Sequence, residues 1–130
     1  MEATQLLKGV LDAAVLAVVQ RDDGYGYDVV RRLRDAGLEE VGDASVYGTL
    51  RRLYAAGALS TYVVPSDDGP HRKYYSITPS GTELLAQQRL DWQRFSGILT
   101  ELIMPSPGAS LGSSSGIDTE PSSAAKGADA

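Results

Sequence analysis

The fold is decided by residues 43–79, which read DASVYGTLRRLYAAGALSTYVVPSDDGPHRKYYSITP. The first part has the spacing of one helix face, with apolar side chains at Val46, Leu50, Leu53 and Tyr54. Asp43 or Ser45 can cap the free N–H groups at its start, and a glycine at position 57 closes it. We therefore predict a helix that begins near Asp43.

The second part of this segment predicts a β-hairpin. Residues 59–64 and 72–77 are rich in β-branched and aromatic side chains, and residues 65–70 between them are a dense cluster of turn formers. Thr78-Pro79 follows, and a threonine N-cap with proline at the first helical position is a specific signal for a helix start.

Two further helices are expected ahead of this segment. The first runs from about Thr4 to Gln20, with apolar side chains around most of its circumference. The second runs from Tyr27 to about Asp35, with its valines and leucine inward and Arg31, Arg32 and Arg34 outward. The order of three helices and a hairpin is that of a winged helix-turn-helix, so the predicted fold class is mainly α with a small β-hairpin.

A long helix is predicted from Pro79 to Met104, where Pro105 stops it. At about 1.5 Å per residue it would be roughly 39 Å long, too long for so small a domain to cover. A stripe with 3-4 spacing runs along it and consists of Leu85, Gln88, Trp92, Phe95, Leu99 and Leu102. This spacing predicts a coiled-coil seam that pairs two copies of the chain.

Residues 105–130 are dominated by serine, glycine, alanine and proline. Such a segment cannot bury enough apolar surface to offset its ordering entropy. The predicted organisation is a winged helix-turn-helix over residues 4–78, a dimerisation helix over 79–104 and a disordered tail over 105–130.

The composition excludes several classes of function. The 130 residues include no cysteine and one histidine, so no disulfide, cysteine-ligated metal or multi-histidine site is expected. The start lacks the basic flank of a signal peptide, and the longest apolar run, residues 13–19, is too short to cross a membrane. We therefore expect a cytoplasmic protein with no membrane partner. No nucleophile–base pair, phosphate loop or metal cluster can be named, so neither enzymatic activity nor a cofactor is expected.

The net charge of −5 argues at first against a nucleic-acid partner. Whole-chain charge, however, averages over surfaces that face in different directions. The predicted recognition segment is locally basic, because Arg51, Arg52, Arg72 and Lys73 outnumber the two acids between residues 45 and 80. The acidity therefore lowers the expectation of DNA binding without removing it.

One face of the predicted helix from Asp43 is narrow, small and cationic. With Leu50 inward, this face and its flanks comprise Ala44, Ser45, Gly48, Thr49, Arg51, Arg52 and Ala55. Such a face fits a major groove about 12 Å wide. A close approach to DNA would explain Gly48, which costs about 1 kcal/mol relative to alanine in an exposed helix.

Among these residues, Arg52 is the best candidate for a base-edge or phosphate contact and Arg51 for a phosphate contact. Ser45 and Thr49 can donate to either. The plain alternative is a solvated helix surface, which is what two exposed arginines usually are.

The hairpin supplies a second cationic element. Arg72 and Lys73 lie where a wing would meet the DNA backbone or minor groove, with His71 as a polar wing residue. Tyr74 and Tyr75 point to opposite faces of the strand, so one packs on the core and the other can reach a phosphate.

Residues 6–85 resemble the PadR family of transcriptional regulators. The resemblance is carried by LLKGVLD at 6–12, YGY at 25–27, SVYGTLRRL at 45–53, GPHRKYY at 69–75 and ITPSG at 77–81. It implies a homodimer that binds a palindromic operator in double-stranded DNA, usually as a repressor. It also implies DNA contacts by Tyr47, Thr49, Arg51 and Arg52 and by the wing at Arg72 and Lys73. Gly48 departs from the proline often found there, and the single C-terminal helix is similar to that of the shorter members.

Trp92 has two interpretations. As a member of the seam it belongs to the dimer core. In some relatives, however, the equivalent tryptophan stacks on flat apolar effectors between the subunits. In that case a pocket for a small aromatic effector would consist of Leu6, Val10, Ala13, Trp92 and Phe95.

The leading hypothesis is a dimeric DNA-binding regulator, and the alternative is a winged-helix protein-interaction module that does not bind DNA. The alternative is supported by the net charge and by the two acids at the wing tip, Asp67 and Asp68.

Overall fold

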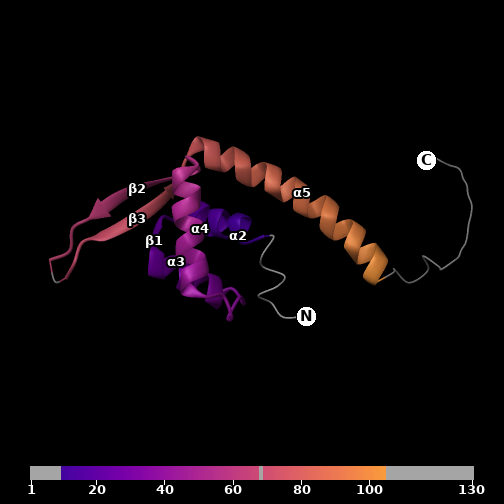
Figure 1. The fold of residues 1–130 in the computed structure, drawn as a ribbon, viewed down its shortest axis with the longest axis horizontal. Helices are drawn as coiled ribbons and strands as arrows, with labels where there is room; N and C mark the ends of the chain where they lie inside the picture. The colour runs from indigo at the N-terminus through magenta and orange to yellow at the C-terminus, as the bar shows by residue number, and fades with distance from the viewer. Residues whose placement is uncertain (1–9, 68, 105–130) are drawn as a thin grey trace, which may run out of the picture. The chain divides into compact units, whose positions relative to one another are not determined.

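A computed structural model describes residues 10–67 and 69–104 of the chain. Its elements, in chain order, are α2 (Leu11–Arg21), β1 (Gly24–Tyr25), α3 (Gly26–Asp35), α4 (Asp43–Ala55), β2 (Leu59–Val64), β3 (Arg72–Ile77) and α5 (Pro79–Ile103) (Figure 1). The predicted fold class is confirmed: the structure is mainly helical with a small antiparallel sheet and a long C-terminal helix. The start of the first predicted helix, the predicted pocket residue Leu6 and the predicted tail over 105–130 lie outside the described residues.

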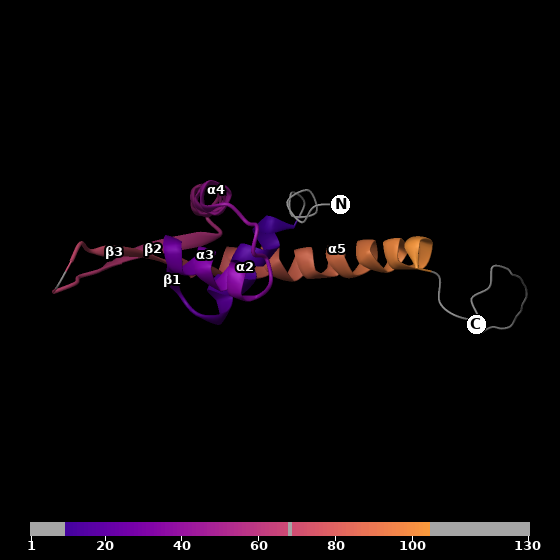
Figure 2. The same cartoon turned by 90° about the horizontal axis from the view of Figure 1, so that it is seen from below.

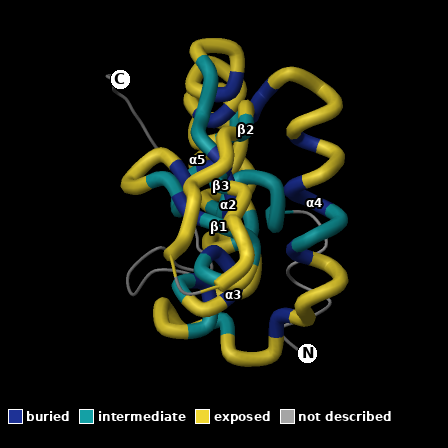
Figure 3. The backbone as a smooth tube through the Cα atoms, turned by 90° about the vertical axis from the view of Figure 1, so that its left-hand side faces the viewer, coloured by how far each residue is buried: buried dark blue, intermediate teal, exposed yellow. Residues whose placement is uncertain are grey.

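Helices α2, α3 and α4 pack around one apolar core. Each contributes a row of buried side chains at helical spacing: Val15, Leu16 and Val19 from α2, Val29, Val30 and Leu33 from α3, and Val46, Leu50 and Leu53 from α4. The buried residues of α4 face the rest of the domain, whereas its opposite side is exposed along the helix (Figure 3). Burial of one face therefore fixes which side of α4 is presented to solvent.

The predicted hairpin is confirmed. Strands β2 and β3 pair antiparallel from Leu59 opposite Ile77 to Val64 opposite Arg72, and the hairpin extends away from α2, α3 and α4 (Figures 1 and 2). The sheet also holds a strand that the sequence did not predict, β1, which pairs with β3 and gives the order β1-β3-β2. Two residues are too few to show an alternating pattern, so β1 carries no sequence signal of its own.

The predicted threonine cap anchors α5 to the end of α4. The backbone N–H of Gly81 donates to Thr78 Oγ1 at 3.0 Å, and the same hydroxyl donates to the carbonyl of Gly57 at 2.7 Å. The N–H of Thr78 donates to the carbonyl of Ala58 at 3.1 Å. The first turns of α5 are thereby part of the winged domain, with Gly81 and Leu85 buried.

The chain divides into two compact units, with the break after Arg89 inside α5. The predicted boundary at residue 78 lies about three helical turns earlier. The difference has a physical cause, because Leu85 is buried in the same core as the side chains of α2 to α4. No helix of the described residues is both long enough and apolar enough to span a membrane.

Three local predictions were wrong. Tyr54, expected on the inner face of α4, is 52% exposed, and Thr49 takes the fourth buried position. Helix α4 is preceded by Gly42 without a side-chain cap; Asp43 instead pairs with Arg34 at 2.7 Å. Arg32 is only partly exposed, because its guanidinium group turns back onto the backbone of the domain.

Candidate nucleic-acid interface

The exposed side of α4 consists of small side chains and two arginines. Ala44, Ser45 and Ala55 are exposed, and an added Cβ at Gly48 would meet only the tip of Arg51, at 4.0 Å. Arg51 is exposed and forms no ion pair with any other described residue. No carboxylate of the described residues therefore neutralises its charge.

Arg52, unlike its neighbour Arg51, forms an ion pair with a described residue. Its two terminal nitrogens bind the carboxylate of Asp12 on α2, Nη1 at 2.7 Å from Oδ2 and Nη2 at 3.0 Å from Oδ1. The hydrogen bond and the negative charge of Asp12 raise the pKa of Arg52. Arg52 remains 60% exposed, so the ion pair lies on the surface beside the exposed side of α4.

Two side chains of α4 that were predicted to contact DNA have partners within the domain. Thr49 is buried, and its hydroxyl donates to the carbonyl of Ser45 at 2.8 Å, so we correct its predicted role as a donor to DNA. Tyr47 is half-buried, and its ring lies 2.5 Å from where a Cβ on Gly26 would be. Only glycine at position 26 leaves room for this ring, which locks α3 against α4.

The wing presents three exposed polar residues, His71, Arg72 and Lys73. The guanidinium carbon of Arg72 lies 4.5 Å from the centroid of the Tyr25 ring, and Lys73 Nζ lies 5.8 Å from that of Tyr75. Aromatic faces attract cations, so these contacts restrict the side chains while leaving the charges at the surface.

Tyr74 and Tyr75 point to opposite faces of β3, as predicted, and Tyr75 is the buried one. Tyr74 stacks on Tyr62 with ring centroids 5.6 Å apart, and it meets Tyr25 edge-on at the same distance. The ring of Tyr74 is therefore part of an aromatic row across the sheet, and its hydroxyl is the group left for a phosphate.

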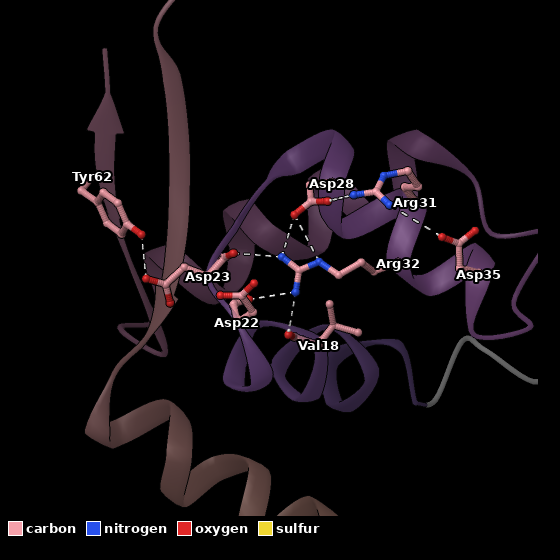
Figure 4. A network of polar contacts seen from close by, with 8 residues as sticks. All are labelled: Val18, Asp22, Asp23, Asp28, Arg31, Arg32, Asp35 and Tyr62. Carbon is pink, nitrogen blue, oxygen red and sulfur yellow. Dashed lines mark hydrogen bonds and ion pairs between the residues drawn. The ribbon is translucent and has the colours of Figure 1, made fainter. Parts of the chain in front are cut away.

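The base of the wing is tied to the helices through a network centred on Arg32 (Figure 4). Arg32 pairs with Asp28 Oδ2 at 2.8 Å. It also donates to the carbonyls of Val18 at 3.1 Å, Asp22 at 2.9 Å and Asp23 at 3.0 Å. These bonds fix the turn between α2 and β1.

From that turn, Asp23 accepts a hydrogen bond from the hydroxyl of Tyr62 on β2 at 2.7 Å. The hydrogen bond raises the pKa of Tyr62. Arg32 on α3 thus orders the turn between α2 and β1, and this turn is hydrogen-bonded to β2, the outer strand of the wing.

Sequence reasoning missed Asp12, Asp23 and Arg32 as parts of this surface. Asp12 had a usable signal, since it is the one charged side chain between residues 9 and 20. An acid within so apolar a helix needs a partner. The partners of Asp23 and Arg32 depend on which segments the fold brings together, and no local pattern specifies that.

On α5 the predicted seam divides into two parts. Leu85 is buried in the domain core, which corrects its assignment to the seam, and Gln88 Oε1 is buried with no hydrogen-bond partner among the described residues. Trp92, Phe95 and Leu102 are 51%, 57% and 73% exposed, Leu99 is half-buried, and Ile98 adds a further exposed side chain. Of the other predicted pocket residues, Val10, just before α2, and Ala13, on α2, pack against the core.

Comparison with known proteins places this fold in a family. The family model for PadR-like transcriptional regulators matches residues 15–87. A PadR-like regulator from Bacillus cereus is 32% identical with a TM-score of 0.69, covering 77% of this chain and 97% of that one. A Streptococcus transcriptional regulator is 34% identical with a TM-score of 0.68, covering 75% and 96% of the two chains. A PadR family regulator from Eggerthella lenta is 27% identical with a TM-score of 0.70, covering 79% and 89%. The chain belongs to the PadR-like family of transcriptional regulators, which are DNA-binding proteins and not enzymes.

Proposed function

We propose that two copies of this chain bind a palindromic operator and repress transcription, with α4 of each copy in the major groove and the β2–β3 wing on the flanking backbone. The observation that carries the proposal is the exposed side of α4, where Ser45, Gly48 and Ala55 leave the helix narrow and Arg51 has no ion pair within residues 10–67 and 69–104. Small side chains let the helix backbone approach the base edges, and an unpaired arginine supplies the phosphate contact.

The wing supports the same orientation. His71, Arg72 and Lys73 are exposed on β3 or just before it. Positive side chains on a projecting hairpin favour the phosphate backbone or the minor groove next to the site that a helix occupies.

The homodimer in this proposal is supported by α5. Trp92, Phe95, Ile98 and Leu102 are all more than half exposed. They recur at helical spacing on a helix that continues beyond the winged domain, and a second copy of the same helix would cover them. A two-fold dimer with one reading helix per subunit predicts half-sites about 10 bp apart, centre to centre.

A planar aromatic effector is a further part of the proposal. Trp92 and Phe95 provide flat apolar surfaces with few polar groups, which suits planar ligands of low polarity. Trp92 is the only tryptophan of the chain, so quenching of its fluorescence by planar aromatics reports binding directly. A ligand that releases the protein from its operator in the same titration would establish relief of repression.

The central test is binding to the promoter DNA next to the gene, with the site located by footprinting and the salt dependence measured. Arg51→Ala is expected to weaken binding to all sequences alike and to reduce the slope of log K against log salt by about 1, because one phosphate contact is lost. Arg21→Ala is the matched control, since Arg21 is exposed at the end of α2 opposite to Asp12. An unchanged slope in Arg51→Ala would remove α4 from the proposed interface.

A further inference from the structure

The ion pair between Asp12 and Arg52 joins a core helix to the helix that we place in the groove. The carboxylate binds the two terminal nitrogens of the guanidinium group at 2.7 and 3.0 Å. We propose that Asp12 is a specificity-determining residue: by neutralising and orienting Arg52 it suppresses binding to random phosphates and reserves this arginine for a base edge in the operator. This inference rests on the proposed placement of α4.

The geometry leaves Arg52 able to read a base. A guanidinium group has five N–H donors, and the two-point contact with Asp12 uses one on each terminal nitrogen. Nη2 also lies 3.5 Å from Thr49 Oγ1. The Nε–H and one hydrogen on Nη1 remain, at a side chain that is 60% exposed. Arg52 thus still has N–H donors for a base edge, and the ion pair with Asp12 fixes the orientation of its guanidinium group.

The charge of the pair decides which partner those donors favour. A free guanidinium binds phosphate oxygens at any DNA sequence, because phosphate contacts carry no sequence information. With Asp12 in contact, the pair is neutral overall, and a phosphate that approaches Arg52 also meets the carboxylate. A base edge such as that of guanine presents neutral acceptors in the major groove, so the carboxylate repels it far less.

The contrast with Arg51 supports this division of roles. Two adjacent arginines on one helix differ in that Arg51 has no ion pair within the described residues and Arg52 has a two-point one. The pair contributes little to folding, as exposed ion pairs do. An acid is nonetheless placed within an otherwise apolar stretch of α2, where it meets the side chain of α4 that lies beside the narrow face.

The test compares Asp12→Asn with the wild type on the footprinted operator and on a scrambled duplex of the same length and composition. Asparagine keeps the shape of aspartate and removes its charge. We expect affinity for the scrambled duplex to rise, with a salt slope steeper by about 1, and the ratio of operator to scrambled affinity to fall roughly tenfold, as loss of an oriented base contact would cause.

Asp43→Asn is the matched control, because it also removes one negative charge from an exposed ion pair with an arginine, Arg34. It is expected to leave the ratio unchanged. In an Arg52→Gln background, Asp12→Asn should have no further effect on the ratio, since the effect passes through Arg52. Thermal unfolding of each variant shows that the fold is intact.

Each outcome separates the two proposals. If the wild type does not prefer its promoter over scrambled DNA, the proposed function fails, and this inference fails with it. If the wild type discriminates but Asp12→Asn behaves like Asp43→Asn, the proposed function stands and the role of Asp12 is overturned.

Discussion

Gly81 lies where the first turn of α5 crosses the segment between α4 and β2. A Cβ at this position would be 2.0 Å from the carbonyl oxygen of Ala58 and 2.9 Å from Ile77 Cγ1. That oxygen already accepts a hydrogen bond from Thr78, so the backbone cannot yield without loss. We predict that Gly81→Ala lowers the free energy of unfolding by about 1–3 kcal/mol, as overpacking does, measured by urea unfolding.

Gly48→Ala is the control for Gly81→Ala because space around Gly48 is open apart from the tip of Arg51. It is expected to raise the free energy of unfolding by up to about 1 kcal/mol, since alanine is the better helix former. Equal destabilisation by both substitutions would contradict the packing at Gly81.

At the residue scale, sequence patterns predicted burial better than polar partners. The spacing of Val46, Leu50 and Leu53 identified the inner face of α4 because burial follows helical periodicity. The same spacing placed Thr49 on the flank of the exposed face, as a possible donor to DNA. The carbonyl of Ser45, one turn earlier, satisfies that hydroxyl instead.

At the scale of single elements, one hydrogen bond joins Tyr62 on strand β2 of the wing to Asp23 in the turn after α2. The bond requires a protonated phenol, and it raises the pKa of Tyr62 above the ordinary value of 10.0. Its stabilising contribution is therefore complete below the pKa of the unfolded chain and is lost as pH rises through the higher pKa of the folded state.

We accordingly predict that Tyr62→Phe unfolds more readily than the wild type at neutral pH. The difference should disappear in strongly alkaline solution, as measured by urea midpoints at a series of pH values. Tyr27→Phe, at an exposed tyrosine outside the sheet, serves as the control. A wild-type advantage that persists after Tyr62 ionises would show that the bond to Asp23 does not hold the wing.

The helices and the two strands of the hairpin could be predicted from the sequence, whereas the two-residue strand β1 could not. The ends of β2, β3 and α5 follow turn formers, the Thr78-Pro79 start signal and Pro105, all of which act locally. Strand β1 forms only because the turn fixed by Arg32 brings Gly24 and Tyr25 against β3. That is a consequence of tertiary structure, which no local pattern encodes.

At the scale of the whole molecule, the proposed dimer rests on the exposed stripe of α5. We predict that the double variant Phe95→Asp with Leu99→Asp is monomeric in sedimentation equilibrium and no longer binds the operator, since charges cannot be buried unpaired in a helix seam. Each monomer should keep its helical circular dichroism, because the core around Leu85 lies in the first unit.

Gln93→Asp with Thr100→Asp adds the same charge to the same helix at exposed polar positions and should remain dimeric. A dimer that persists in the Phe95–Leu99 variant would place the subunit contact elsewhere.

The sequence predicted the order of the elements, whereas the compact units divide after Arg89 and not at the predicted residue 78. The 3-4 spacing through Leu85 and Gln88 is continuous with the stripe at Trp92 and Phe95, so periodicity alone cannot separate core from seam. The two are distinguished by what covers them, and Leu85 is covered by the chain itself.

The internal pairing of arginines also bears on how this protein finds its target. In the described part of the chain, five arginines pair with carboxylates of the same molecule, namely Arg31, Arg32, Arg34, Arg52 and Arg94. With a net charge of −5, the chain as a whole is only weakly attracted to the phosphates of random DNA, and binding of that kind is what permits sliding along the duplex. We therefore expect the search to proceed by repeated collisions from solution, so that arrival at the operator depends on the copy number of the protein in the cell and hardly on the length of flanking DNA.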